Sequence, residues 1–228
     1  MNNVFIVAEI GCNHNGDKKL AKKLVEEAKK CGVDAVKFQT FKAKNLISRY
    51  APKAEYQKET TGENDSQLEM TAKLELSYND FIELKKYAES LGLIVFSTPF
   101  DMESVNFLDS INQKLWKIPS GEITNLPYLE RIGSIDRQGK KIILSTGMAT
   151  IDEIKKCIDI LVKAGTNEED IILLHCNTEY PTPDCDVNIL AIKDLKNNFP
   201  KVNVGFSDHS VGYIAAVGAT ALGICLIE

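Results

Sequence analysis

Carboxylates follow or close several apolar runs of this sequence. The run from Val4 to Val7 leads to Glu9, Glu122 lies in a polar motif after another run, and Glu228 closes the run at 224–227. A buried carboxylate must be paired or protonated. Each of the three is therefore either a structural partner for a lysine or a catalytic group.

Two lysines occupy comparable positions. Lys37 and Lys117 both follow apolar residues, so they could point inward as fixed cations toward a phosphate or a carboxylate. The alternative is an ordinary solvated or ion-paired lysine. Hydroxyl groups at or near a Gly or Pro would surround the same anion, although singly they are ordinary turn formers and caps. They belong to Thr98, Ser120, Ser145 and Ser207.

The chain contains three histidines. His209 lies in Ser207-Asp208-His209-Ser210, a position suited to binding a metal or transferring a proton, whereas a lone histidine is more often structural. His14 sits in an Asn/Gly turn where it could bond to backbone. His175 ends an apolar run, where a satisfied core histidine is at least as plausible.

Composition and missing motifs exclude several classes of function. No Walker loop, G-x-G-x-x-G or G-x-S-x-G motif occurs. The net charge is -5 with both signs interspersed, so we expect no nucleic-acid partner and no membrane surface. There is no leader pattern and no run of about 18 apolar residues, which predicts a cytoplasmic protein. Six cysteines without a C-x-x-C pair are expected to be reduced and mostly buried.

The elements that position these residues alternate along the chain. At 228 residues and 44% hydrophobic content, the chain can bury one core, and we expect one domain. Helices separate the apolar runs, with Asp17 as a predicted N-cap and Thr150 with Glu153 as a capping box. The predicted strands are 4–10, 34–40, runs starting near 93, 114, 141 and 171, then 202–206 and 224–227.

This alternation predicts an α/β fold with a parallel sheet and outer helices. Eight repeats favour a (β/α)8 TIM barrel, in which catalytic groups lie at the carboxyl ends of the strands. A doubly wound open sheet is the alternative, but it would not readily spread polar residues over nearly every strand end. The segment from Phe41 to Asn64 lacks a sustained period and is long, which indicates a functional loop.

The chain stops at Glu228, directly after an apolar strand. A terminal strand without a covering helix would leave a barrel sector bare. We therefore expect a barrel truncated after strand eight.

Together these motifs resemble the sialic acid synthase family, which comprises N-acetylneuraminate synthases and their legionaminate and pseudaminate relatives. The resemblance covers essentially the whole chain in order. Its motifs are Ala8-Glu9-Ile10-Gly11, Asn13-His14-Asn15-Gly16-Asp17, Lys37-Phe38-Gln39-Thr40, Ser97-Thr98-Pro99-Phe100, Lys117-Ile118-Pro119-Ser120-Gly121-Glu122, Ser145-Thr146-Gly147-Met148, Tyr180-Pro181-Thr182-Pro183 and Gly205-Phe206-Ser207-Asp208-His209.

The resemblance implies a metal-dependent condensation of phosphoenolpyruvate with an N-acylated hexose such as N-acetylmannosamine, giving a nine-carbon 2-keto acid and phosphate. C3 of phosphoenolpyruvate attacks the open-chain aldehyde, and water adds at C2. The phosphoenolpyruvate-binding residues that it implies are Lys37, Thr98, Lys117, Ser120, Ser145 and Ser207. The residues implied to face the sugar are Gln39, Thr178, Tyr180 and Glu228, with Thr178 standing where relatives often have Asn.

The resemblance also assigns Glu9 as the catalytic carboxylate and His209 as a metal ligand. The implied metal is Mn²⁺, with Mg²⁺ or Co²⁺ as alternatives. In the family, a second histidine ligand and a small antifreeze-like domain follow strand eight, and that domain contributes an Arg across a homodimer. Neither is present in this sequence, so we expect an incomplete metal and sugar site, and a homodimer only at full length.

Two other hypotheses remain open. One is an aldolase that forms a Schiff base at Lys37 or Lys117. The other is an inactive truncated barrel that only binds phosphoenolpyruvate or serves as a partner subunit. Without the resemblance, the residues alone indicate an anion-binding (β/α)8 enzyme of unknown reaction.

Overall fold

The computed structural model describes residues 4–52 and 66–228, which form two compact units. Unit 1 contains the described residues of Met1–Ala8 together with Gln113–Glu228, and unit 2 contains those of Glu9–Asn112. The first strand therefore begins in unit 1 and ends in unit 2.

Eight parallel strands alternate with helices along the chain, which confirms the predicted (β/α)8 TIM barrel class. Their order in the sheet is β3-β2-β1-β8-β7-β6-β5-β4. Their bounds are β1 Phe5–Gly11, β2 Ala35–Thr40, β3 Ile94–Pro99, β4 Leu115–Ile118, β5 Lys141–Ser145, β6 Ile171–His175, β7 Asn203–Phe206 and β8 Leu226–Ile227.

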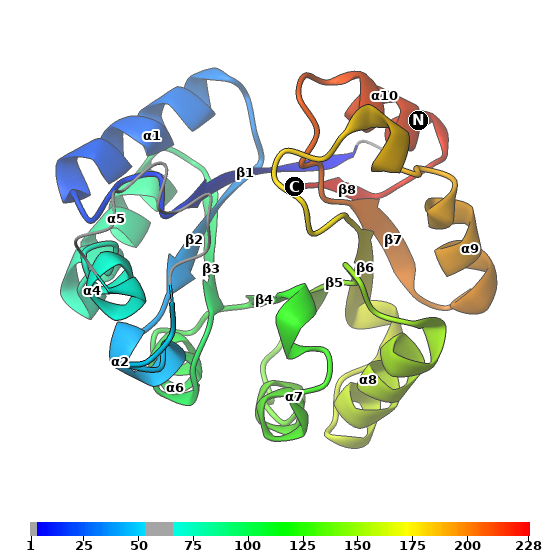
Figure 1. Cartoon of the computed structure of the whole chain (residues 1–228), viewed down its shortest axis with the longest axis horizontal. Helices are drawn as coiled ribbons and strands as arrows, with labels where there is room; N and C mark the ends of the chain where they lie inside the picture. Colours follow the sequence, from blue (N-terminus) through cyan, green and yellow to red (C-terminus); the bar gives the residue numbers. More distant parts are fainter. Residues whose placement is uncertain (1–3, 53–65) are drawn as a thin grey trace. The chain divides into compact units, whose positions relative to one another are not determined.

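In unit 1, helices lie along one side of strands β4 to β8 (Figure 1). The register of the strands sets Ser145 of β5 beside Leu174 of β6, and His175 of β6 beside Phe206 of β7. The carboxyl ends of these strands therefore meet at one edge, which gathers the polar residues that follow them. The helices are α7 Leu126–Gly133, α8 Ile151–Lys163, α9 Ala191–Asn198 and α10 Ile214–Ala221.

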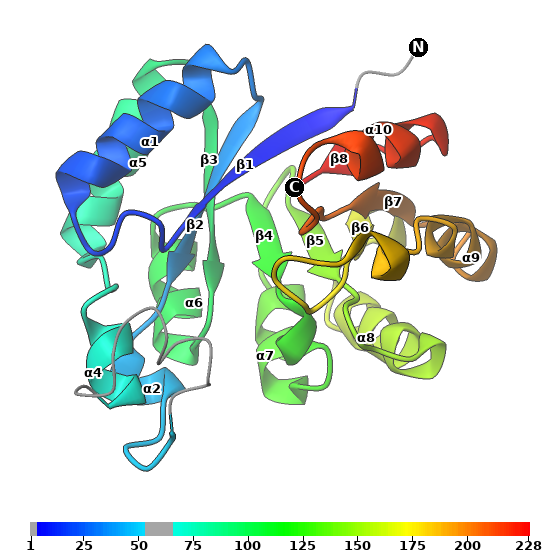
Figure 2. The ribbon, with the colours of Figure 1, turned by 45° about the horizontal axis from the view of Figure 1, so that its top comes forward.

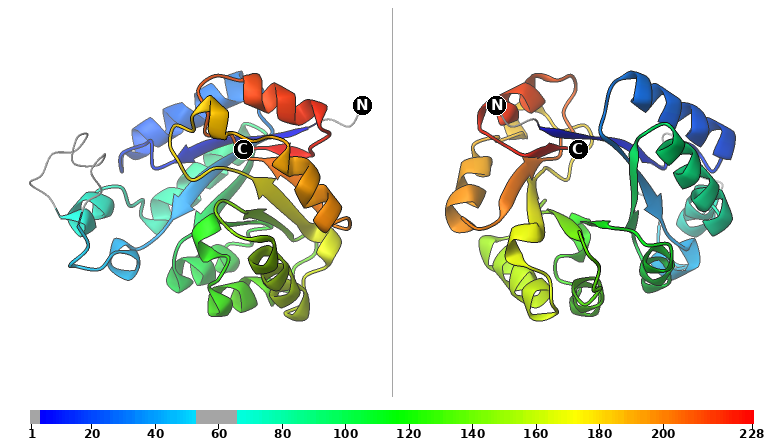
Figure 3. Two further views of the ribbon diagram at one scale, coloured as in Figure 1. Left: turned by 45° about the vertical axis from the view of Figure 1, so that its right-hand side comes forward. Right: turned by 180° about the vertical axis from the view of Figure 1, so that it is seen from behind.

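Helix α8 shows why these segments fold as predicted. The Thr150 side chain accepts from the Glu153 backbone, and Glu153 reaches back to the Thr150 backbone, so the predicted capping box is confirmed. Its buried residues include Cys157 and Leu161, one turn apart on the inner face. Helix α8 packs beside α7 in unit 1 (Figure 3).

In unit 2, β2 pairs with β3 so that Gln39 lies opposite Thr98. Asp17 caps α1 by accepting from the Lys19 backbone at 2.7 Å, as predicted. Helix α1 packs on α5 (Figure 2), whose N-cap is Ser77. The helices of this unit are α1 Lys18–Lys30, α2 Ala43–Leu46, α4 Gln67–Ala72, α5 Tyr78–Ser90 and α6 Met102–Ser110.

The structure differs from prediction in two segments. A short helix, α2, lies inside the predicted loop at 41–64, and the part of that loop at 53–64 is outside the described residues. The sequence pattern also predicts a helix near Val187 to Phe199. In the structure this helix begins only at Ala191, because Asn188 has a φ of +43°, which a right-handed α-helix cannot accommodate.

All six cysteines are unbridged, but the prediction that most are buried is wrong. Cys157 and Cys176 are buried, Cys12 and Cys225 are half-buried, and Cys31 and Cys185 are exposed. In the parts of the chain that the structure describes, no helix combines the length and apolar character needed to cross a membrane.

Candidate functional site

In unit 2, a lysine joins a carboxylate to a hydroxyl group. The ammonium of Lys37, on β2, forms an ion pair with Glu9 and donates to Thr98 Oγ1 at 3.4 Å. The Lys37 side chain is 5% exposed, whereas that of Glu9 is 33% exposed. Glu9 is therefore the member of the pair that a ligand in solvent can reach.

The backbone at the end of β1 shapes the position of the Glu9 carboxylate. Gly11 has a φ of +50°, and a Cβ atom there would lie 2.6 Å from Glu9 Oε1. A side chain at this position would be strained and would push the carboxylate away. Glycine thus allows the carboxylate to fold against the backbone.

Gln39 contacts a thiol that sequence reasoning did not single out. Cys12 Sγ donates to Gln39 Oε1 at 3.2 Å. Burial and, to a smaller extent, the negative charge of Glu9 raise the pKa of Cys12 to about 11, while the positive charge of Lys37 opposes the change. The thiol therefore stays protonated at neutral pH and remains a donor to Gln39.

In unit 1, a hydroxyl group donates a hydrogen bond to the carboxylate of a buried ion pair. Lys117, on β4, lies 2.6 Å from Glu228, and their side chains are 5% and 7% exposed. Ser207 Oγ donates to Glu228 Oε2 at 3.1 Å. Lys117, Ser207 and Glu228 thus come together, with the charges of the pair balancing each other.

His209 is held in one tautomer. Its Nδ1 lies 2.7 Å from the backbone oxygen of Asn177, which can only accept, so Nδ1 carries the hydrogen and Nε2 keeps a lone pair. Burial lowers the pKa of His209, which favours the neutral ring. The Tyr180 ring stacks on the His209 ring, with centroids 4.0 Å apart.

The surroundings of His209 suit a role of its Nε2 atom as one ligand of a divalent metal ion. Nε2 lies 3.2 Å from Ser207 Oγ, whose single hydrogen is donated to Glu228. The lone pair of Nε2 is thus left for another partner, while the Asn177 carbonyl orients the ring as in metal sites. Within residues 4–52 and 66–228, no group of three or more His, Cys, Asp or Glu side chains could itself hold a metal ion.

A second cluster of unit 1 surrounds Ser120, the first residue of the 3-10 helix after β4. Gly147 packs directly on it, since a Cβ atom at Gly147 would lie 2.5 Å from Ser120 Oγ and 3.1 Å from Thr178 Cγ2. The Gly147 N–H donates to Cys176 Sγ at 3.2 Å. Ser145, two residues before Gly147, is buried at the end of β5.

The predicted site residues therefore fall into clusters within the units. Glu9, Lys37 and Thr98 come together in unit 2, where Gln39 contacts Cys12. In unit 1, Lys117, Ser207, His209, Tyr180 and Glu228 form one linked set, and Ser120 and Thr178 meet at Gly147.

The other two histidines have local roles. His14 is fully buried and accepts from the Gly16 N–H at 3.0 Å, and His175 Nε2 bonds to the Val187 backbone oxygen at 2.8 Å. Sequence reasoning missed Cys12, Gly147 and Cys176. Gly147 lies inside the motif Ser145-Thr146-Gly147-Met148, whereas Cys12 and Cys176 lie outside the motifs named above. Their contacts join segments that are distant in the sequence, so no local pattern could have found them.

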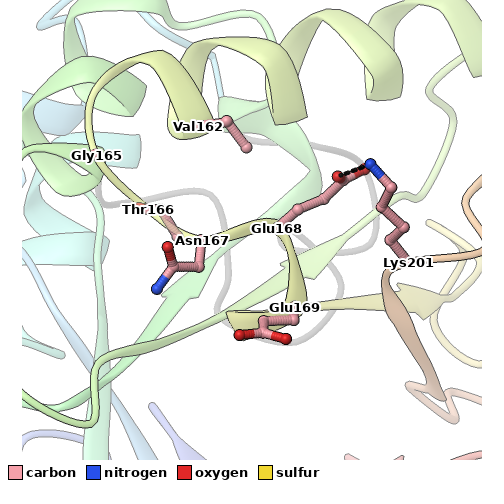
Figure 4. Close-up of a pocket in the computed structure, with 7 residues that line it drawn as sticks. All are labelled: Val162, Gly165, Thr166, Asn167, Glu168, Glu169 and Lys201. Atoms are coloured by element: carbon pink, nitrogen blue, oxygen red, sulfur yellow. Dashed lines mark ion pairs between the residues drawn. The ribbon is translucent and has the colours of Figure 1, made fainter.

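A separate pocket of unit 1, of about 640 Å³, lies between the end of α8 and β6 (Figure 4). Of its three charged residues, Glu168 and Lys201 form an ion pair at 3.3 Å, and Glu169 is the third. None of the predicted site residues lines it.

Comparisons with known proteins agree over nearly the whole chain. The model of the NeuB family matches residues 24–228. An N,N'-diacetyllegionaminic acid synthase of Campylobacter jejuni is 51% identical over all of this chain and 67% of its own length. One of Legionella pneumophila is 46% identical over 98% of this chain and 62% of its own length.

A solved structure is also similar. It is an N-acetylneuraminic acid synthetase from Leptospira borgpetersenii, in complex with citrate. It has a TM-score of 0.84 and 34% identity, and the match covers all of this chain and 73% of that chain. The chain thus spans roughly two thirds of the length of the two curated synthases.

Proposed function

Because the chain belongs to the NeuB family, we propose that it is a nonulosonate synthase that condenses phosphoenolpyruvate with an N-acylated hexose. The observation that carries the proposal is a repeated arrangement. Each unit sets a buried lysine beside a carboxylate, with a hydroxyl group at hand: Lys37 with Glu9 and Thr98, and Lys117 with Glu228 and Ser207.

Buried ammonium groups with hydroxyl donors suit phosphoenolpyruvate, which carries a phosphate and a carboxylate. In the proposal, the ligand's anionic oxygens take hydrogen bonds from Lys37, Lys117 and the hydroxyl groups. The hydroxyl donors are those of Thr98, Ser120, Ser145 and Ser207. Each lysine is neutralised by a carboxylate in this structure, which lowers the cost of burying its charge before the ligand binds.

Glu9 is proposed to move the proton of the adding water. The C3 carbon of phosphoenolpyruvate forms a bond to the aldehyde carbon, and the aldehyde oxygen takes a proton. Water adds at C2 and loses one proton to Glu9, which supplies the proton that the aldehyde oxygen takes. The resulting tetrahedral centre expels phosphate, which carries away the proton of the C2 hydroxyl group as the 2-keto acid forms. Lys37 holds the carboxylate in its ionised form for this step.

His209 is proposed to hold the divalent metal through Nε2, with Mn²⁺ as the expected ion and Mg²⁺ or Co²⁺ as alternatives. When bound, such an ion supplies Lewis-acid polarisation of the sugar aldehyde. The protein's own part is to fix the ring by the Asn177 carbonyl and the Tyr180 stack.

The sugar is proposed to meet Gln39, Thr178, Tyr180 and Glu228. The Tyr180 ring is 73% exposed, so it offers an apolar face to a sugar ring. The relatives at 51% and 46% identity are named for a product with two acetyl groups. We therefore include a diacetamido hexose beside N-acetylmannosamine as candidate substrates. The homodimer and the cytoplasmic location remain part of the proposal.

The Schiff-base alternative requires an uncharged amine, whereas Lys37 and Lys117 are each ion-paired with a carboxylate. Borohydride trapping of a carbonyl substrate without added metal would favour that alternative over ours. Binding of phosphoenolpyruvate in a calorimeter without any turnover would favour the inactive barrel.

The test is phosphate release measured with Mn²⁺, phosphoenolpyruvate and each sugar in turn. We expect release only when all three are present, and a loss of roughly 100-fold or more in kcat for Glu9→Gln. Unchanged turnover in Glu9→Gln would remove Glu9 from the mechanism. Release that does not depend on any sugar would reject the synthase proposal.

A further inference from the structure

We propose that Cys176 is a positioning residue that holds the Ser120 hydroxyl and the Gly147 turn in register for binding the anionic substrate. This inference rests on the proposed function, because it concerns a cluster assigned there to phosphoenolpyruvate. No sequence motif pointed to this thiol, whose contacts within unit 1 reveal its role.

Three segments of unit 1 meet at one sulfur atom. Cys176 follows β6 and is 4% exposed. Its Sγ accepts the Gly147 N–H at 3.2 Å, from the turn after β5, and lies 3.6 Å from Ser120 Oγ, in the 3-10 helix after β4. A side chain that ties three strand ends together sets the positions of the groups they carry.

The packing between these segments leaves little room for adjustment. A Cβ atom at Gly147 would lie 2.5 Å from Ser120 Oγ and 2.6 Å from its Cβ, so the turn is already in close contact with Ser120. Gly147 also has a φ of +33°, a backbone conformation that favours glycine over residues with a side chain. If the sulfur is removed, the turn loses its hydrogen bond, and both the turn and Ser120 can shift.

The chemistry of sulfur suits this role. A thiol is a weak hydrogen-bond partner, so it can orient the Ser120 hydroxyl without binding it strongly. The hydroxyl can then turn to an anionic oxygen, with which hydrogen bonds are stronger. The Gly147 N–H is bonded to Cys176, which leaves Ser120 as the donor that this contact prepares.

The test compares Cys176→Ala with Cys157→Ala. Cys157 is also a buried thiol, but it lies on α8 outside the cluster, so its variant controls for loss of a buried sulfur. For Cys176→Ala we expect KM for phosphoenolpyruvate to rise roughly 5- to 10-fold, the effect of one lost hydrogen bond. We expect kcat and KM for the sugar to stay within about twofold. Cys157→Ala should leave all three unchanged.

Each outcome decides the inference. If the wild-type protein turns over and Cys176→Ala keeps its KM for phosphoenolpyruvate, the inference is wrong and the proposed function stands. A 5- to 10-fold fall in kcat of Cys176→Ala with unchanged KM for phosphoenolpyruvate would also overturn the inference. If Cys176→Ala does not fold, Cys176→Ser replaces it, and the same selective rise in KM is expected because a hydroxyl competes for Ser120.

If the wild-type protein releases no phosphate with any sugar, the proposed function fails and calorimetric titration with phosphoenolpyruvate decides the inference. Weaker binding in the Cys176 variant than in Cys157→Ala would support it. Equal binding in both, or no binding by the wild-type protein, would overturn it.

Discussion

In unit 1, the ammonium of Lys117 lies 2.6 Å from the carboxylate of Glu228, and both side chains are almost fully buried. The two residues are 111 positions apart in the chain. Removing one partner of a buried pair leaves the other charge uncompensated, which is costly. The pair therefore ties the end of β4 to the residue after β8.

We predict that Glu228→Gln lowers the free energy of unfolding by about 3 to 5 kcal/mol, measured by urea denaturation. The matched control is Asp170→Asn, which breaks the more exposed pair of Lys141 and Asp170 at 3.2 Å. That change should stay within about 1 kcal/mol. An equal decrease of the free energy of unfolding in the two variants would show that burial does not make the pair of Lys117 and Glu228 more important for stability.

A second prediction concerns the turn beneath Glu9. Gly11→Ala should reduce kcat strongly, because the added Cβ atom would displace the carboxylate that it meets at 2.6 Å. Gly32→Ala is the control, since Gly32 also has a positive φ but a Cβ atom there would meet no atom within 4 Å. Steady-state kinetics with both variants tests this. Similar kcat values would mean that the contact between Gly11 and Glu9 is unimportant.

The thiols provide a third prediction. Burial raises the pKa of Cys12 to about 11 and that of Cys157 to about 12, so at pH 8 only roughly one Cys12 thiol in a thousand is ionised. Exposed Cys31 and Cys185 should react with iodoacetamide much faster, as followed by peptide mass spectrometry. Alkylation of Cys12 as fast as that of Cys31 would contradict this assignment.

The pH dependence of stability gives a fourth prediction. Burial lowers the pKa of His14 below 6.5, and His14 Nε2 is buried with no hydrogen-bond partner among the described residues. Below about pH 6.5 the unfolded chain takes up this proton before the folded protein does, so stability is present above that pH and lost below it. His209 shifts in the same direction.

The urea concentration at the midpoint of unfolding should therefore decrease as the pH is lowered from 7.5 to 5.5. The decrease should be smaller in His14→Gln. The variant removes one group whose protonation favours the unfolded chain, although it also loses the bond to the Gly16 N–H. An identical slope in both proteins would exclude His14 as a source of the acid sensitivity.

Local signals in the sequence were enough to predict the framework. Asp17 and the pair Thr150 and Glu153 cap their helices through contacts within three residues, so the sequence shows them directly. The alternation of apolar runs with helices predicted the (β/α)8 class, and the apolar residues before Lys37 and Lys117 predicted the strands that carry them, although Lys37 lies in the middle of β2.

What could not be predicted depends on contacts between distant segments. The bonds from Cys12 to Gln39 and from Gly147 to Cys176 join residues 27 and 29 positions apart, and no local pattern marks them. The start of α9 was missed because the left-handed conformation of Asn188 breaks a helix that apolar periodicity alone would extend.

The most direct test of the proposed synthase is mass spectrometry of the reaction with phosphoenolpyruvate, Mn²⁺ and an N-acylated hexose. The proposal predicts a nine-carbon 2-keto acid formed in equal amount to the phosphate released, with either N-acetylmannosamine or a diacetamido hexose as substrate. Phosphate accompanied by pyruvate, with no nine-carbon product from any of these sugars, would contradict it.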